Sequence, residues 1–201
     1  MKKVFILSLS LGLLLFNCSK ENEPDNSNKI NGHEYVDLGL PSGIKWATCN
    51  VGATTEYEYG NYYSWGITEP NTITWLDNNE VEEISGTSFD VAHVDWGGSW
   101  RMATLDEWNE LINNCEWSWV SNGAKSGYNI TGPNGNSIFL PAAGICQGEI
   151  WGTETQGFYW TSTRCPADFA YDAFGLTFDN NSIRIDGWNL SNGRTIRPVS
   201  N

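Results

Sequence analysis

The residues of this chain that could bind a metal ion lie mostly between residues 69 and 95. Asp90, His93 and Asp95 stand close together, and carboxylates beside an imidazole are a possible metal-ligand set. Glu69 and Asn71 could offer oxygens to calcium, which takes about six to eight of them. Isolated polar groups in a loop are more often simply solvated, so we expect no metal site and no cofactor.

Residues for nucleophilic or acid–base catalysis are equally sparse. The only histidines are His33 and His93, and neither stands in a nucleophile–base pattern. Asp and Glu are numerous, but nothing singles out a pair. We therefore expect that the protein is not an enzyme.

Four cysteines lie in the body of the chain, at positions 49, 115, 146 and 165. No two have the close spacing of a zinc site or a redox dithiol. In an exported protein they could form disulfides, and four cysteines allow three pairings. We favour Cys49–Cys115 with Cys146–Cys165, and free thiols are the alternative.

The N-terminus has the pattern of a secretion signal. Lys2 and Lys3 precede an apolar run, Val4 to Phe16, that is short for a membrane span. Leu15-Phe16-Asn17-Cys18 resembles a bacterial lipoprotein cleavage site, which predicts that residues 1–18 are a signal peptide ending at a lipidated Cys18. The alternative is an ordinary cleaved signal with an incidental cysteine.

Residues 19–30 are polar and acidic with almost nothing apolar, which is typical of a flexible tether. The first of them look like the acidic export tag of Bacteroidetes surface lipoproteins. We therefore expect a lipid-anchored protein of the outer membrane that faces the cell exterior and contacts the membrane through its lipid only.

Composition predicts one aromatic-rich domain over residues 31–201. The chain has 201 residues, and its 11 Trp, 8 Tyr and 8 Phe supply much of a core. The net charge of −13 and the lack of a basic patch disfavour nucleic acid as a partner. We expect a monomeric domain.

One helix is clearly predicted, at about residues 104–115. Thr104 and Glu107 have the spacing of a capping box. The apolar residues then recur at helical spacing on one face: Leu105, Trp108, Leu111, Ile112 and Cys115. In front of the helix, Gly97-Gly98 between Trp96 and Trp100 predicts a tight turn.

Strands and turns account for the rest of the domain. Alternation and turn residues predict hairpins from 33–39 with 44–49, from 128–131 with 137–140, and from 174–178 with 183–185. Further strands are expected at 57–66, 115–120, 157–163 and 194–199, with a turn at 141–144 and a long polar surface loop at 67–95. One helix among many short strands indicates an α+β domain with twisted antiparallel sheets.

Seven segments in order resemble the Fibrobacter succinogenes major paralogous domain family over roughly residues 32–200. They are the segments 36–43 (VDLGLPSG), 46–53 (WATCNVGA), 62–66 (YYSWG), 96–102 (WGGSWRM), 138–144 (IFLPAAG), 159–163 (YWTST) and 194–199 (RTIRPV). The resemblance implies a C-type-lectin-like fold, related to phage tropism determinants and to the formylglycine-generating enzyme. It also implies that these motifs are scaffold and that ligand contacts fall between them.

The resemblance places the binding face in the last strands and loops, between Thr163 and Gly193. The polar and aromatic residues of that span are the candidate ligand contacts: Arg164, Tyr171, Asp172, Arg184, Asp186, Trp188 and Asn189, with Asp168, Phe169, Asp179, Asn180 and Asn181 beside them. Trp188 has the setting of an aromatic anchor that stacks on a ligand, or it simply fills the core beneath the loop.

Two further family features do not carry over. Glu69-Pro70-Asn71 matches the sugar-binding tripeptide of calcium-dependent C-type lectins, but the nearest partner text, Trp108-Asn109-Glu110, lies on the predicted helix. The formylglycine-generating relatives use a C-terminal cysteine pair, and Cys146 and Cys165 are too far apart for that motif.

The function that follows is binding of a glycan or protein ligand by the C-terminal loops of a rigid scaffold. A structural or adhesin subunit of a surface appendage is the alternative, with an enzyme of the formylglycine-generating lineage as the third. Exposed apolar patches would favour docking of a protein, and a concave aromatic-polar pocket would favour a sugar.

Overall fold

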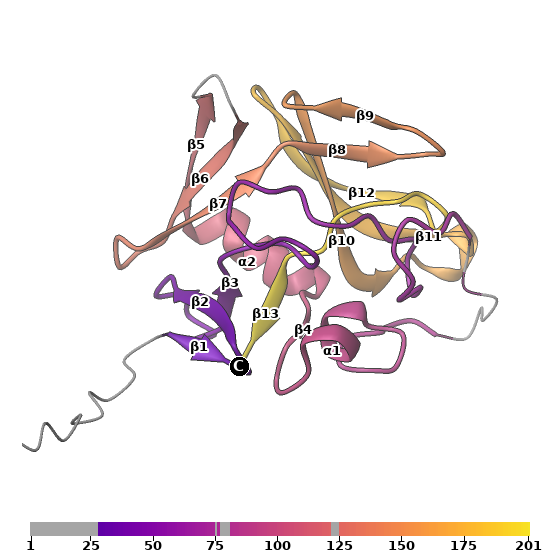
Figure 1. The fold of residues 1–201 in the computed structure, drawn as a ribbon, viewed down its shortest axis with the longest axis horizontal. Coiled ribbons are helices and arrows are strands. Elements are labelled where there is room, and N and C mark those ends of the chain that lie inside the picture. Colours follow the sequence, from indigo (N-terminus) through magenta and orange to yellow (C-terminus); the bar gives the residue numbers. More distant parts are fainter. Residues whose placement is uncertain (1–27, 75, 77–80, 122–124) are drawn as a thin grey trace, which may run out of the picture.

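The computed structural model of the protein describes residues 28–74, 76, 81–121 and 125–201, and these form a mostly β structure with three sheets and few short helices (Figure 1). The expected signal peptide, Cys18 and nearly all of the expected tether lie outside the described residues. Within them, no helix is long and apolar enough to cross a membrane.

The first sheet joins the start of the domain to its end, in the order β1-β2-β3-β13-β4. Its strands are β1 (Lys29–Ile30), β2 (His33–Asp37), β3 (Lys45–Ala47), β13 (Pro198–Ser200) and β4 (Arg101–Met102). Antiparallel pairing of β2 with β3 confirms the N-terminal hairpin. The last strand is shorter than expected, because Arg194 and Thr195 make isolated bridges only.

The second sheet, β12-β11-β10-β8-β9, contains the C-terminal span. Its strands are β8 (Ala143–Cys146), β9 (Ile150–Thr153), β10 (Gln156–Arg164), β11 (Asp172–Asp179) and β12 (Ile183–Asn189). The third sheet, in the order β5-β6-β7, is built from β5 (Glu116–Ser121), β6 (Ser126–Thr131) and β7 (Ser137–Pro141), so both later hairpins are confirmed.

The helix α2 (Leu105–Asn114) confirms the predicted helix. The Thr104 hydroxyl accepts from the Glu107 amide and the Glu107 carboxylate accepts from the Thr104 amide, which completes the capping box. The preceding turn is also confirmed, because Gly97 and Gly98 have φ angles of 62° and 61°, in the left-handed region. Trp108 and Leu111 are fully buried beneath this helix.

Four predictions about local structure are wrong. The end of the 67–95 segment is helix α1 (Val91–Trp96), because buried Asp90 caps it and Val91 and Ala92 pack inward. Residues 57–66 form no strand beyond a bridge at Tyr63. In the expected turn 141–144, Pro141 belongs to β7 and Ala143 and Gly144 belong to β8. The second sheet includes one parallel pairing, between β8 and β10.

Two cores hold the sheets together. The first lies between α2 and all three sheets, and it includes Trp46, Trp108, Tyr159, Leu176 and Phe178. The second lies around α1, on the other face of β10 and β11, and its largest members are Tyr63, Trp65, Trp96, Trp100 and Trp160. Because both faces of β10 and β11 are covered, these strands form a rigid base for the connections at their ends.

Candidate functional site

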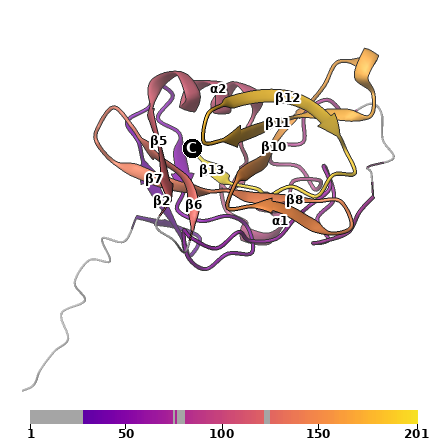
Figure 2. The same ribbon diagram turned by 90° about the horizontal axis from the view of Figure 1, so that it is seen from above.

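The connection between β10 and β11, residues 165–171, carries the most exposed aromatic side chains of the described chain. It contains the short 3-10 helix η1 (Ala167–Phe169), and Phe169 and Tyr171 expose 62% and 64% of their surface. Figure 2 shows this turn, coloured orange, projecting from one end of the molecule. Large exposed aromatic groups that lie together are typical of a binding surface.

Backbone hydrogen bonds fix both ends of this connection. The Cys165 amide donates to the Asp172 carbonyl at 3.0 Å, and the Leu190 amide donates to the Tyr171 carbonyl at 2.9 Å. The connection is therefore a closed loop on a rigid sheet end, which lowers the entropy lost when it binds a ligand.

Arg164 supports the connection from below and is nearly fully buried. Its guanidinium donates to the Ala170 carbonyl and lies 5.8 Å from the centre of the Trp65 ring. Its backbone amide donates to the Glu82 carbonyl at 2.8 Å. Arg164 thus joins the connection to the segment before α1, although its side chain also faces a pocket.

Two pockets flank the connection. The larger, of about 470 Å³, lies beneath η1 and is lined by Glu82, Thr163, Arg164, Cys165, Pro166, Ala167, Ala170 and Phe174. The smaller, of about 350 Å³, is lined by Tyr171, Asn189, Leu190 and Ser191. Together with the exposed rings they make a surface with concave apolar walls and a few polar groups, as ligand sites have.

The structure divides the seven expected contact residues into two groups. Arg164, Tyr171, Asp172 and Asn189 lie around the connection, and the last two are directly paired between β11 and β12. Arg184, Asp186 and Trp188 alternate along one face of β12 instead, where Arg184 Nε donates to Asp186 Oδ2 at 2.6 Å. Trp188 lies in a strand, and the loop expected around it does not exist.

Trp188 packs partly against the second core. Its ring meets the Phe158 ring edge-on at 5.9 Å between centroids and lies 4.4 Å from the Arg194 guanidinium. The ring therefore covers other side chains, and part of its surface remains accessible to solvent.

Sequence reasoning missed an exposed apolar pair on β9 at the edge of the second sheet. Ile150 and Trp151 expose 52% and 48% of their surface, and the Trp151 ring contacts Phe158 edge-on. The sequence does carry a signal for this strand, because two adjacent apolar residues stand between Gly148 and Gly152. So short a pattern does not distinguish a hairpin from a loop.

Asp90, one of the residues considered for metal binding, holds backbone amides in the structure. The Asp90 carboxylate is fully buried and accepts four backbone amides, from Gly86, Ala92, His93 and Met102, at 2.8 to 3.1 Å. In the described part of the chain, no group of three or more His, Cys, Asp and Glu side chains is arranged to hold a metal ion. Asp90 is thus a helix cap.

All four described cysteines are free thiols, so neither favoured disulfide is present. Cys49 follows β3 and Cys115 ends α2, while Cys146 ends β8 and Cys165 follows β10. Burial raises the pKa of the Cys115 and Cys165 thiols to about 11, which keeps them protonated at neutral pH.

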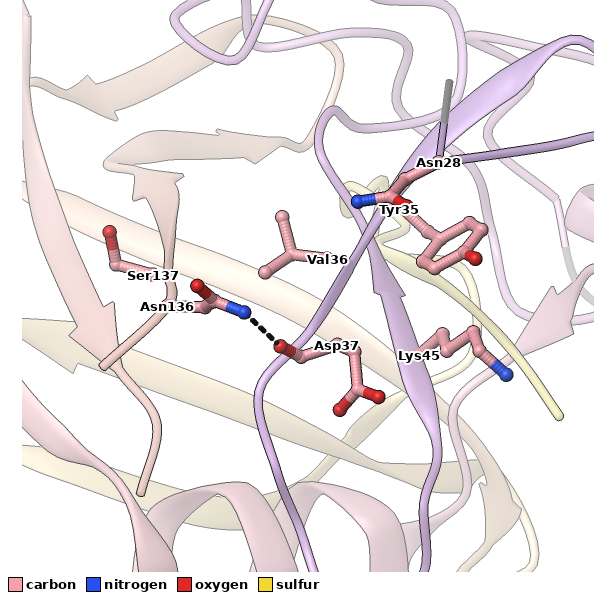
Figure 3. Close-up of a pocket in the computed structure, with 7 residues that line it drawn as sticks. All are labelled: Asn28, Tyr35, Val36, Asp37, Lys45, Asn136 and Ser137. Atoms are coloured by element: carbon pink, nitrogen blue, oxygen red, sulfur yellow. Dashed lines mark hydrogen bonds between the residues drawn. The ribbon is translucent and has the colours of Figure 1, made fainter. Parts of the chain in front are cut away.

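A third pocket, of about 350 Å³, lies at the opposite end of the molecule beside Asn28, between β2 and the turn before β7 (Figure 3). Two of its polar side chains already have partners. Asn136 Nδ2 donates to the Asp37 carbonyl at 2.8 Å, and Lys45 Nζ lies 5.6 Å from the centre of the Tyr35 ring. No exposed aromatic side chain overhangs it, which makes it a weaker candidate than the β10–β11 connection.

Comparison of the chain with protein-family models, with curated proteins and with solved structures found no match. The function proposed below therefore rests on the geometry of the described residues and on the sequence motifs.

Proposed function

We propose that this chain is a surface lipoprotein whose C-type-lectin-like domain binds a glycan or protein ligand through the β10–β11 connection. The observation that carries the proposal is the exposure of Phe169 and Tyr171 beside two pockets lined by the same connection. The proposed activity is recognition without catalysis.

The chemistry of the connection suits a sugar or a protein side chain. Phe169 and Tyr171 offer flat apolar faces that can stack on a sugar ring, and amide and hydroxyl groups of Asn189 and Ser191 can fix its orientation. Aromatic side chains also lose little conformational entropy on binding, because each has only two rotatable side-chain bonds.

The position of the connection agrees with display from a membrane. In both views, η1 lies at the end of the molecule away from β1 and β2, where the described chain begins (Figures 1 and 2). A lipid on Cys18 would hold the N-terminal end near the membrane and would leave the connection facing outward.

A second candidate function is docking within a surface assembly or adhesin. The exposed Ile150 and Trp151 on the edge strand β9 favour it, because an edge strand with apolar side chains can pair with a protein partner.

Binding of the full chain, purified in a mild non-ionic detergent, to a glycan array tests the proposal. We expect a reproducible signal that is lost when Phe169 and Tyr171 are both replaced by Ser. Tyr57→Ser is the matched control, because Tyr57 is 44% exposed and lies outside the connection. Repeating the array with EDTA tests for calcium, which we expect to be unnecessary.

A blank array with folded protein would reject a glycan ligand. Capture of a protein partner that is lost with Trp151→Ser and kept with the Phe169 and Tyr171 double variant would then favour the docking function. A glycan signal unchanged in the double variant would reject the β10–β11 connection as the site.

A further inference from the structure

The side chain of Arg194 is buried with a charge that no hydrogen bond satisfies. None of its surface is exposed, and Nε, Nη1 and Nη2 all lack a hydrogen-bond partner among the described residues. Its backbone is fixed, because Arg194 and Tyr63 exchange two backbone hydrogen bonds of 2.9 and 3.0 Å. Burial lowers the pKa of the guanidinium well below its usual value, which reflects the cost of removing this charge from water.

Three aromatic rings surround the guanidinium and offset part of that cost. The carbon Cζ of Arg194 lies 5.2, 4.6 and 4.4 Å from the ring centres of Phe158, Trp160 and Trp188. Such contacts are favourable, but they give the N–H groups of the guanidinium no hydrogen-bond acceptor.

The register of the second sheet explains why Arg194 fits there. Trp160, Gly175 and Asp186 are direct cross-strand neighbours, so Gly175 lies at the centre of one face of β10, β11 and β12. A Cβ atom at Gly175 would come within 2.4 Å of Arg194 Nη1. The missing side chain at position 175 therefore leaves the space that the guanidinium occupies.

Two further buried polar atoms without partners lie on the same face. Thr177 lies two register positions from Gly175 along β11, and Trp188 lies opposite Ala173, two positions from Gly175 in the other direction. Neither Thr177 Oγ1 nor Trp188 Nε1 has a hydrogen-bond partner among the described residues. The nitrogens can only donate, and the hydroxyl can also donate. A buried water would need acceptors as well as donors, and this group offers the Thr177 hydroxyl alone.

We propose that Arg194, Thr177 and Trp188 form a receptor for the carboxylate of a small ligand such as a hexuronic acid. A carboxylate only accepts hydrogen bonds and pairs with a guanidinium in a forked geometry, so it suits a set of unused donors. The Trp188 ring covers the Arg194 guanidinium and must turn outward to admit the ligand. It lies on the edge strand β12 and has no hydrogen bond at Nε1 to break when it turns outward.

Asp186 is an acid on this face of β12, and it opposes an incoming carboxylate. It neighbours Gly175, and its carboxylate is paired with Arg184 at the exposed edge of the sheet. Replacing Asp186 by Asn removes this repulsion and is expected to strengthen binding. The inference goes beyond the function proposed above, because neither pocket at the β10–β11 connection includes Thr177, Trp188 or Arg194.

Isothermal titration of the full chain in mild detergent with sodium glucuronate tests the receptor. Glucose is the control for the sugar without a carboxylate, and sodium chloride at the ionic strength of the glucuronate is the control for salt. Sodium acetate tests the carboxylate alone. We expect saturable binding of glucuronate, weaker binding of acetate and none of glucose. Asp186→Asn is expected to bind glucuronate a few times more tightly.

Thr177→Val is the decisive variant, because it removes an unpartnered hydroxyl at nearly constant volume. The unliganded variant is expected to be as stable as the parent or more so, while its affinity for glucuronate falls about tenfold. Arg194→Met is expected to abolish binding, and Thr177→Val keeps the test valid if that variant does not fold.

Two results would overturn the inference. One is a folded protein that binds neither glucuronate nor acetate. The other is a Thr177→Val variant with unchanged affinity for glucuronate. The double substitution of Phe169 and Tyr171 is expected to leave glucuronate binding unchanged. The experiment therefore distinguishes a failure of this inference from a failure of the function proposed above.

Discussion

Arg197 donates from Nε to Asn50 Oδ1 at 2.8 Å, and this buried pair joins two ends of the domain that are 147 residues apart. The remaining guanidinium nitrogens donate to the carbonyls of Ala47, Thr48 and Phe139 at 3.0 to 3.1 Å. Arg197 is thus satisfied by four neutral acceptors on two segments, residues 47–50 and Phe139. Arg194, three residues earlier, differs from Arg197 because its guanidinium donates no hydrogen bond to the described residues. Arg197 therefore has a structural role, whereas Arg194 has unused donors.

Arg197→Lys is expected to destabilise the domain by about 3 kcal/mol or more, because an ammonium cannot reach four acceptors in a plane. Urea unfolding followed by circular dichroism measures the change. Arg184→Lys, at a half-exposed position, is the matched control and should change the free energy of unfolding by less than about 0.5 kcal/mol. Equal effects of the two variants would contradict the structural role of Arg197.

Asp90→Ala is expected to cost about 2–4 kcal/mol, because it leaves four buried backbone amides without an acceptor. Glu116→Ala, which removes an exposed carboxylate from β5, is the control. The same unfolding measurement checks both. If metal binding were the role of Asp90, EDTA would lower the melting temperature of the parent protein, and we expect it to have no effect.

The Glu107 carboxylate gives the domain a defined dependence on pH. Burial raises its pKa, but hydrogen bonds from Arg101 and Thr104 outweigh burial and lower the pKa overall. Its folded-state pKa therefore lies below the unfolded value of roughly 4.3. The stabilisation is fully present above that value and is lost as the pH falls through the folded pKa.

Glu107→Gln should therefore be less stable than the parent by about 1–2 kcal/mol at pH 7, and the difference should shrink below roughly pH 4.3. Urea unfolding at a series of pH values tests this. A difference that stays constant down to pH 3 would show that the charge of Glu107 contributes nothing.

The free thiols predict that a reducing agent leaves stability unchanged. A native disulfide typically contributes about 2–4 kcal/mol, so its reduction would lower the melting temperature by several degrees. We expect equal melting temperatures with and without dithiothreitol. Thiol titration of the unfolded chain should detect Cys49, Cys115, Cys146 and Cys165, and fewer than these four would show that a disulfide forms.

Replacing both Phe169 and Tyr171 by Ser should change the free energy of unfolding by less than about 0.5 kcal/mol, because both side chains are mostly exposed. Thermal unfolding of the double variant checks this. A large loss of stability would mean that the two aromatic residues support the fold, and loss of ligand binding by the variant would then say nothing about the site.

The sequence by itself determined the local elements whose signals are complete within a few residues. The capping box at Thr104 and Glu107, the turn at Gly97 and Gly98, and the three hairpins are all in the structure. Each depends on backbone geometry or on alternation between neighbouring residues, which tertiary contacts here reinforce. Helix α1 was missed because it has only 6 residues, too few to show a helical repeat in the sequence.

Only the tertiary structure decided which C-terminal residues lie together. Sequence order placed Trp188 beside Asn189, but successive residues of a strand face opposite sides, so Asn189 joins Tyr171 while Trp188 covers Arg194. The space for Arg194 depends on Gly175 across the sheet, a relation that appears only once the strand register is fixed. The candidate residues were therefore readable from the chain, whereas their division between the β10–β11 connection and one face of β12 follows from pairing across β10, β11 and β12.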